Sequence, residues 1–148
     1  MNEEVKARAF RIVEKREVSR KMLIDKLTEK GASPEDAQEV ADRLCELRVI
    51  DDGRFAGMVV RHYAGKGYGL RRIQEELYRR GIDRELWDEA LEELSEEDDS
   101  VYRQLCRRMR GENTTEAQKK AIAALQRRGF SWSEIRSALD RYLMENEE

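Results

Sequence analysis

Apolar residues recur along this chain at the three- and four-residue intervals that place them on one face of a helix. The stretch 86–94 illustrates the pattern, because Leu86, Trp87, Ala90, Leu91 and Leu94 gather on one side. Similar stripes predict nine helices, at about 5–15, 20–30, 34–48, 52–64, 70–80, 84–94, 100–110, 116–128 and 132–144. The pattern therefore predicts an all-α protein.

Residues typical of helix ends support these boundaries. Ser33 followed by Pro34 is a strong start signal, and Ser131 with Glu134 has the spacing of a capping box. Asp83 and Thr115 are the expected N-caps of the sixth and eighth helices. Glycines that end helices follow the second helix of each predicted trio, at Gly31, Gly81 and Gly129.

These three glycines mark an internal repeat. When the three sequence segments are aligned on these glycines, apolar residues occupy the same positions in each. These positions lie four residues before the glycine and six, nine and thirteen residues after it. The matched sets are Leu27, Leu77 and Leu125; Ala37, Trp87 and Ile135; Val40, Ala90 and Ala138; and Leu44, Leu94 and Tyr142. The repeat predicts three tandem three-helix units, at 1–49, 50–97 and 98–148, packed on their neighbours in an elongated, curved array. The acidic stretch 95–100 is the clearest boundary between units.

Composition agrees with the helical prediction. The 148 residues are 39% hydrophobic and 41% charged, with one proline. Glu, Lys, Arg, Ala and Leu dominate, and these are strong helix formers. A compact sheet would need more β-branched and aromatic residues.

Several classes of function find no support in the sequence. His62 is the only histidine, and no nucleophile–base arrangement or P-loop accompanies it. The acidic runs lack the spacing of a metal site, so no cofactor and no enzymatic activity are expected. Cys45 and Cys106 are expected to be reduced thiols. No apolar run of about 18 residues and no signal peptide is present, so we expect a cytoplasmic protein with no membrane partner.

The net charge of −3 conceals charged patches of alternating sign. Residues 54–80 are mainly basic, 83–99 are mainly acidic, and Arg103, Arg107, Arg108 and Arg110 are basic again. The candidate site residues come from the first patch: Arg54, Arg61, Lys66, Tyr68, Arg71, Arg72, Arg79 and Arg80. Arginines near helix ends and a glycine-rich turn suit phosphate groups or acidic protein surfaces.

A purely structural interpretation of the same stretch remains open. On a helical wheel, Glu75 and Glu76 share the polar side with the arginines, where pairs four residues apart would stabilise an exposed face. Each such pair contributes only about 0.2–0.5 kcal/mol. Tyr68 could stack on a base or pack beneath the turn.

Four motifs, in order along nearly the whole chain, resemble those of the RecX family, which modulates the RecA recombinase. They are Arg16-Glu17-Val18-Ser19 with Leu23 and Lys26-Leu27; Ile50-Asp51-Asp52 with Arg54-Phe55-Ala56; Lys66-Gly67-Tyr68-Gly69 with Arg71-Arg72-Ile73, Glu76-Leu77 and Gly81-Ile82; and Arg127-Arg128-Gly129-Phe130-Ser131 with Ile135. The resemblance implies three tandem three-helix repeats that bind in the groove of the RecA–DNA filament. It also implies inhibition of ATP hydrolysis and strand exchange, with filament extension blocked or disassembly promoted.

The leading hypothesis is therefore a non-enzymatic inhibitor of RecA, monomeric, whose partners are the RecA filament and DNA. One alternative is a nucleic-acid-binding module that acts without RecA, although phosphates would repel the acidic stretch 83–99. Another is a helical adaptor for a different protein. Co-sedimentation with RecA filaments distinguishes the first hypothesis from the adaptor.

Overall fold

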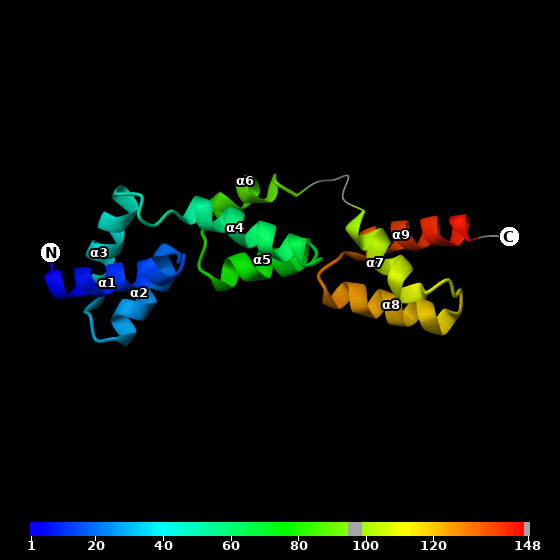
Figure 1. Ribbon diagram of the computed structural model, residues 1–148, viewed down its shortest axis with the longest axis horizontal. Helices are drawn as coiled ribbons and strands as arrows, with labels where there is room; N and C mark the ends of the chain where they lie inside the picture. The colour runs from blue at the N-terminus through cyan, green and yellow to red at the C-terminus, as the bar shows by residue number, and fades with distance from the viewer. Residues whose placement is uncertain (95–98, 147–148) are drawn as a thin grey trace. The chain divides into compact units, whose positions relative to one another are not determined.

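The structure, a computed structural model, describes residues 1–94 and 99–146, and within these ranges it contains helices and no β-strand (Figure 1). The α-helices are α1 (Glu3–Lys15), α2 (Arg20–Glu29), α3 (Pro34–Glu46), α4 (Asp52–Gly65), α5 (Leu70–Arg79), α6 (Trp87–Leu91), α7 (Ser100–Met109), α8 (Thr115–Arg127) and α9 (Trp132–Glu145). A short 3-10 helix, η1 (Arg84–Leu86), leads into α6. The all-α prediction is confirmed. Residues 95–98 of the predicted acidic boundary lie outside the described ranges.

Side-chain caps fix most helix starts where the sequence predicts them. The Ser33 hydroxyl accepts a hydrogen bond from the Asp36 N–H at 3.1 Å, and Ser131 and Glu134 form the expected capping box. The cap of α8 is Thr114 rather than Thr115. Thr114 has the extended backbone that an N-cap requires, and its hydroxyl accepts from the Ala117 N–H at 3.0 Å.

The sixth helix is shorter than predicted. Asp83 makes no side-chain capping bond, and α6 ends at Leu91, so Leu94 lies beyond it. The Trp87 indole N–H instead donates to the Ile82 carbonyl at 3.0 Å, which holds the ring against the preceding turn. Glu92 and Glu93 would face the negative end of a longer helix, and this disfavours its extension.

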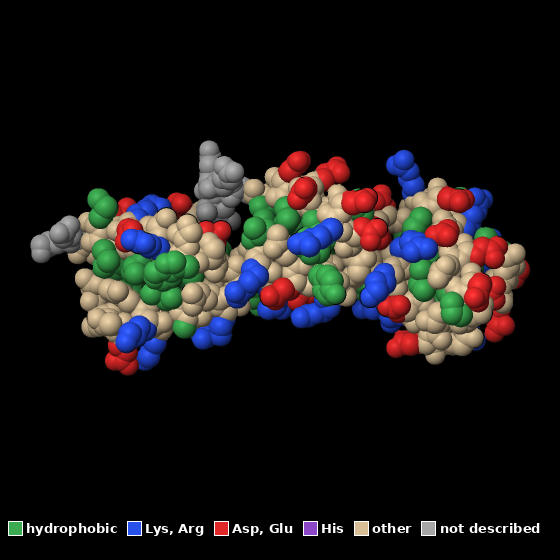
Figure 2. All heavy atoms as spheres, turned by 180° about the vertical axis from the view of Figure 1, so that it is seen from behind, with side chains coloured by type: hydrophobic (Ala, Val, Ile, Leu, Met, Phe, Trp, Pro, Cys, Tyr) green, Lys and Arg blue, Asp and Glu red, His purple; other side chains and the backbone are tan. Residues whose placement is uncertain are grey.

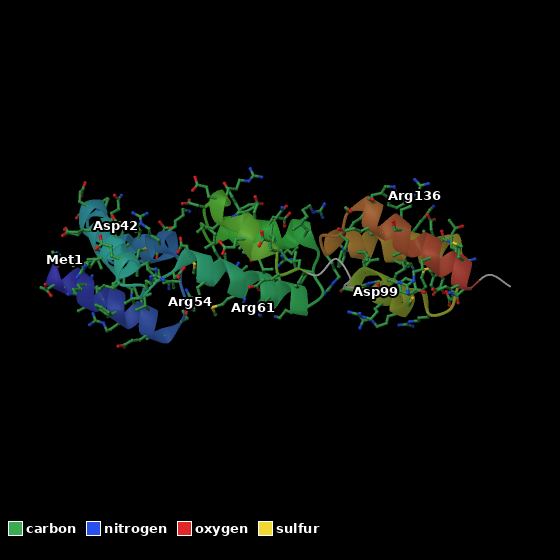
Figure 3. All side chains as sticks on the ribbon, turned by 90° about the horizontal axis from the view of Figure 1, so that it is seen from above. Met1, Asp42, Arg54, Arg61, Asp99 and Arg136 are labelled. Carbon is green, nitrogen blue, oxygen red and sulfur yellow. The ribbon has the colours of Figure 1, made fainter. Side chains whose placement is uncertain are left out.

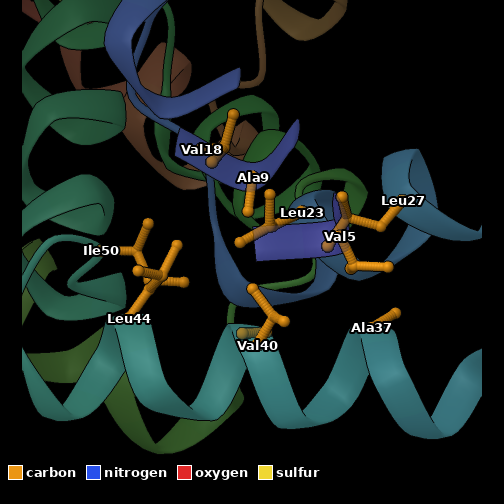
Figure 4. Close-up of a cluster of buried hydrophobic side chains, with 10 residues drawn as sticks. Val5, Ala9, Val18, Leu23, Leu27, Ala37, Val40, Leu44 and Ile50 are labelled. Carbon is orange, nitrogen blue, oxygen red and sulfur yellow. The ribbon is translucent and has the colours of Figure 1, made fainter. Parts of the chain in front are cut away.

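The described chain divides into two units. Unit 1 comprises residues 1–59 and 76–91, and unit 2 comprises 60–75 and the described part of 92–148. The core of unit 1 lies between α1, α2 and α3 (Figure 4), where Leu23, Leu27 and Leu44 are fully buried. Each buried leucine stabilises the fold by about 2 kcal/mol. Ala9 is also fully buried, and its small side chain lets the helices approach closely.

The core of unit 2 lies between α7, α8 and α9. Leu105, Met109, Leu125 and Ile135 are fully buried there. The Tyr142 hydroxyl, at the edge of this core, donates to the Glu112 carbonyl at 2.9 Å. This bond ties α9 to the loop between α7 and α8.

The repeated glycines end helices as predicted and adopt a left-handed backbone, but their surroundings differ. φ is +101° at Gly31, +71° at Gly81 and +98° at Gly129. In unit 2, a Cβ at Gly129 would lie 2.6 Å from the backbone nitrogen of Arg72. In unit 1, a Cβ at Gly81 would lie 2.6 Å from the Cβ of Lys21, whereas one at Gly31 would meet no atom of the described residues within 4 Å. Gly81 and Gly129 are therefore required by close packing as well as by backbone conformation.

In unit 1, the start of α2 receives two groups from the second repeat. The Ser19 hydroxyl caps α2 and donates to the Arg80 carbonyl at 2.5 Å. The carboxylate of Asp52 accepts the backbone N–H of Arg20 at 2.8 Å. Burial raises the pKa of Asp52, although this hydrogen bond opposes the rise. The first helical N–H groups of α2 are thus satisfied by side chains.

Candidate binding surface

The turn at residues 66–69, which the sequence singles out, packs within unit 2 against the turn between α8 and α9. The Gly69 N–H donates to the Arg128 carbonyl at 2.7 Å, and the Arg71 N–H donates to the Gly129 carbonyl at 3.2 Å. A Cβ at Gly69 would lie 2.6 Å from the Gly129 carbonyl. The N-terminus of α5 thus meets the C-terminal carbonyls of α8, a favourable arrangement of helix dipoles. The close packing of this junction explains why residue 69 is a glycine, and no bound ligand is needed to explain it.

Tyr68 packs against arginines of the same unit. Its ring centroid lies 4.7 Å from the guanidinium carbon of Arg72 and 4.5 Å from that of Arg128. The Tyr63 ring lies 5.7 Å away, and Tyr68 is half-buried. Of the two interpretations of Tyr68, the structure supports packing beside the turn. Cation–π attraction between the Tyr68 ring and these two guanidinium groups stabilises the fold without any ligand.

Arg71 also bonds to its own chain. Its guanidinium donates to the Gln126 carbonyl at 2.6 Å and lies 3.9 Å from the Glu75 carboxylate. The side chain remains 63% exposed. Arg71 therefore contributes to the α5–α8 junction while its outer edge stays accessible.

Arg54 and Arg61 form surface ion pairs. In unit 1, Arg54 lies 3.3 Å from the carboxylate of Glu17. In unit 2, one guanidinium nitrogen of Arg61 donates to both carboxylate oxygens of Glu93, at 2.7 and 2.9 Å. Exposed pairs of this kind contribute about 0–1 kcal/mol, so an external partner could displace the carboxylates at little cost.

Glu76 departs from its predicted exposure. The helical wheel placed it on an open polar face, but its side chain is 1% exposed. Arg79 pairs with it at 3.1 Å, and Arg80 forms a shorter pair with its second oxygen. Both partners were predicted as site residues. A buried carboxylate needs such partners, because its desolvation is otherwise costly.

The eight predicted site residues therefore do not converge on one site. Lys66, Tyr68, Arg71 and Arg72 surround the junction in unit 2, where Arg61 also lies, whereas Arg54, Arg79 and Arg80 belong to unit 1. Among them, neither the Lys66 ammonium nor the Tyr68 phenol has an ion pair or hydrogen bond to the described residues. On the face shown in Figure 2, basic and acidic side chains are widely interspersed.

A second basic region lies on unit 2, and Lys66 is the one predicted site residue among its described lining. It is a hollow of about 1160 Å³, here called the basic hollow, bounded by α7, the start of α8 and the end of α4. Its seven basic side chains are Lys66, Arg103, Arg107, Arg108, Arg110, Lys120 and Arg128, and its two acidic ones are Glu112 and Glu116. In Figure 3, nitrogen-tipped side chains gather along α7 near the labelled Asp99.

The cations of the basic hollow differ in their bonding. Lys120 pairs with Glu116 at 3.4 Å. Arg128 donates to the carbonyls of Lys66 and Gly67, which are neutral acceptors and leave its charge uncompensated. Arg107 and Arg108 have neither an ion pair nor a hydrogen bond to the described part of the chain. The Arg110 side chain has neither as well, so these three are the least engaged arginines of the region.

Two sets of contacts fix α7 in place. On its inner side, the buried Gln104 amide donates to the Gly67 carbonyl at 2.8 Å and to the Ser100 hydroxyl at 3.0 Å. Towards α9, the Tyr102 hydroxyl donates to the Glu145 carboxylate, and the Arg141 guanidinium carbon lies 3.7 Å from the Tyr102 ring centroid.

The hydrogen bond between Tyr102 and Glu145 shifts the pKa of both groups. Together with Arg141, it lowers the pKa of the Glu145 carboxyl, and it raises the pKa of the Tyr102 phenol. These bonds leave the arginine-bearing side of α7 facing the hollow.

Other candidate chemistry is sparse in the described residues. They include no helix long and apolar enough to cross a membrane. No group of three or more potential metal ligands occurs within residues 1–94 and 99–146. Cys45 and Cys106 are free and half-buried, and burial raises the pKa of the Cys45 thiol.

Comparisons with known proteins give one consistent result. Models of the first, second and third three-helix domains of RecX match residues 6–44, 51–91 and 96–139, respectively. The regulatory protein RecX of Xanthomonas citri is 40% identical over 134 residues, covering 88% of this chain and 83% of that protein. The RecX of Halorhodospira halophila is 33% identical over 140 residues, covering 93% and 87%. The crystal structure of RecX from Lactobacillus salivarius has the same fold, with a TM-score of 0.80, 22% identity and 94% coverage of each chain.

Proposed function

This chain belongs to the RecX family of regulatory proteins, and on that premise we propose that it inhibits the RecA recombinase by binding in the groove of the RecA–DNA filament. The observation that carries the proposal is the match of three successive RecX domain models, in order, at 6–44, 51–91 and 96–139. The proposed partners are the RecA filament and the DNA within it, and the proposed setting is the bacterial cytoplasm.

The proposed mechanism requires binding and no chemistry. A protein that binds one state of the filament more tightly than another shifts the filament towards that state. Binding in the groove would hold RecA in a state that does not complete its ATPase cycle, and would block strand exchange and filament extension. The protein acts as a monomer in this proposal.

The exposed arginines of α4 and α5 are proposed to contact the filament. The side chains of Arg61, Arg71 and Arg79 are 57%, 63% and 69% exposed, respectively. The exposed carboxylate partners of Arg61 and Arg71 can be exchanged for acidic groups of a partner with little net loss. Arg79 would contact the filament while it keeps its pair with the buried Glu76. Arg80 is less suited to this role, because its side chain is 27% exposed and it neutralises the buried Glu76.

The test is inhibition of the single-stranded-DNA-dependent ATPase of RecA, together with co-sedimentation with RecA filaments. We expect the protein to pellet with the filaments and to lower ATP hydrolysis as its concentration rises. If ATP hydrolysis is unchanged and the protein stays in the supernatant at concentrations equal to RecA, the proposal is wrong.

A matched pair of variants tests the proposed surface. Arg61 pairs with Glu93 at 2.7 Å, and Arg20 pairs with Asp42 at 2.8 Å, so both belong to exposed, long-range ion pairs. We expect Arg61→Gln to raise the concentration for half-inhibition about fivefold, equivalent to about 1 kcal/mol of lost binding. Arg20→Gln should match the wild type. Equal effects of the two substitutions would remove Arg61 from the contact surface.

A further inference from the structure

We infer that the basic hollow of unit 2 binds the phosphodiester backbone of single-stranded nucleic acid. The inference deepens the proposed function, on which it rests for the presence of DNA beside the bound protein. It assigns the DNA contact to α7 and the start of α8. The residues predicted from the sequence lie mainly elsewhere, on α4, α5 and the turn between them.

The first argument is the excess of positive charge in a concave surface. Seven basic and two acidic side chains line the hollow, and one acidic residue, Glu116, already pairs with Lys120. A concave wall of low dielectric concentrates the field of such charges and attracts anions. The N-terminus of α8, a helix of 13 residues, opens at the same place and adds its positive end.

The second argument is that the arginines of α7 are available. Arg107 and Arg108 are exposed and make no ion pair or hydrogen bond to residues 1–94 or 99–146. Their guanidinium groups therefore offer forked donors that match phosphate oxygens. No acidic residue occurs within α7, so no carboxylate of that helix competes with an incoming anion.

The third argument identifies the part of the nucleic acid that is recognised. No aromatic side chain is among the described residues that line the hollow, so these residues offer no ring on which a base could stack. Contacts from arginine and lysine to phosphates position a strand without reading its sequence. The hollow is therefore suited to the backbone and not to a nucleotide base.

The fourth argument distinguishes one strand from two. A hollow of about 1160 Å³ accommodates a ligand only slightly larger than a typical small molecule. Duplex DNA has a persistence length of about 50 nm, so it can present to the hollow only the few phosphates that face it. A flexible single strand can place successive phosphates within it.

The experiment measures binding of a fluorescent 20-nucleotide oligo(dT) by anisotropy, without RecA, at several NaCl concentrations. The hollow variant carries Arg107→Gln and Arg108→Gln. The matched control carries Arg127→Gln and Arg136→Gln, two exposed arginines of α8 and α9 outside the hollow, with Arg136 on the other side of the unit in Figure 3. Both variants lose two positive charges, and glutamine suits helices, so both should fold.

We expect the wild-type protein to bind with an affinity that falls steeply with salt. Losing two phosphate contacts should weaken binding about 25-fold at 0.1 M salt and reduce the magnitude of the log–log salt slope by about 1.4. The control variant should stay within about twofold of the wild type. Inorganic polyphosphate should compete with oligo(dT), because it presents the same phosphate groups.

Four outcomes would overturn the inference. They are no binding by the wild type at 0.05 M salt, equal losses in the two variants, tighter binding of duplex than of oligo(dT), and competition by poly-glutamate as effective as that by polyphosphate. The last would assign the hollow to an acidic protein segment. Because RecA is absent, these outcomes are independent of the ATPase assay: inhibition of RecA without oligo(dT) binding would leave the proposed function standing and remove this site.

Discussion

The arginines of α5 and those of α7 look alike in the sequence but differ in what they contact. Both helices carry three arginines and an apolar stripe. In α5, Arg71 bonds to Gln126 and Glu75, and Arg79 pairs with Glu76. In α7, Arg107 and Arg108 have no such partner among the described residues. The difference separates arginines that already bond within the fold, even where their outer edges stay exposed, from arginines that have no such bond.

The physical origin of this difference lies in the neighbouring acids and in the helix ends. The sequence of α5 contains Glu75 and Glu76, within reach of its own arginines. Its N-terminus also meets carbonyls of α8 within unit 2. The sequence of α7 contains no acidic residue, and its contacts come from Tyr102 and Gln104 on other sides of the helix.

The largest predicted effect tests whether close packing between α5 and α8 holds the α5 arginines in their hydrogen bonds. We expect Gly129→Ala to destabilise the protein by about 3 kcal/mol, because it adds a positive-φ strain of about 1 kcal/mol and a backbone clash at the start of α5. Gly31→Ala is the control, since φ is similarly positive there and the space is open. It should cost only about 1 kcal/mol.

The free energy of unfolding, measured in urea for both glycine variants, checks this prediction. If Gly129→Ala lowers the free energy of unfolding no more than Gly31→Ala does, the junction between α5 and α8 accommodates an added methyl group easily. The arginines of α5 would then be freer than their hydrogen bonds indicate, and the contrast with α7 would weaken.

The next effect compares one arginine from each region. Arg80→Gln removes a charged partner from the buried Glu76 and should cost about 2 kcal/mol of stability, the range found for hydrogen bonds to buried charges. Arg108→Gln, on the free face of α7, should lie within about 0.5 kcal/mol of the wild type. Thermal and urea unfolding of the two variants measure both values. Similar losses would contradict the division into structural and available arginines.

Much of the fold follows from the sequence because its determinants are local. Helix periodicity, caps such as Ser33 and Ser131, and the glycines at equal offsets all act within a few residues. The third repeat shows how far this holds, since Leu125 and Ile135 are buried as predicted. The prediction for the sixth helix is wrong at its C-terminal end. The hydrogen bond of the Trp87 indole and the acidic residues after Leu91 determine where this helix ends.

The candidate site was less predictable because pairing and burial are tertiary properties. A helical wheel assigns Glu76 to the polar side but cannot show that its carboxylate is buried. Nor could the sequence show that Gly69 meets Gly129, 60 residues later in the chain. One signal was present, however: α7 has three arginines and no acid, whereas α5 has both.

A smaller effect is expected at Tyr68, which lies at the base of the α5 junction. Tyr68→Leu should cost about 1 kcal/mol, because it removes the ring from two guanidinium groups at a partly exposed position. Tyr68→Phe keeps the ring and should be close to neutral, since the phenol oxygen has no hydrogen bond to the described residues. Equal losses in the two variants, measured by urea unfolding, would assign the effect to the hydroxyl instead.

The smallest effect concerns the opposite side of α7, where the helix is held to α9. The hydrogen bond from Tyr102, together with Arg141, lowers the pKa of the Glu145 carboxyl. Its contribution is therefore complete above the ordinary glutamate pKa of about 4.3 and is lost as pH falls through the lower folded value. We expect the melting temperature of the wild type to approach that of Tyr102→Phe between about pH 5 and pH 3.

The arginine face of α7 provides the control for this pH dependence. Arg107 has no carboxylate partner among the described residues, so Arg107→Gln should differ from the wild type by a constant amount between pH 5 and pH 3. Melting curves that run parallel for the wild type and Tyr102→Phe would mean that the tie to α9 does not depend on the charge of Glu145. A pH-dependent difference for Arg107→Gln would reveal a carboxylate that interacts with Arg107, and the availability of that arginine would then have to be rejected.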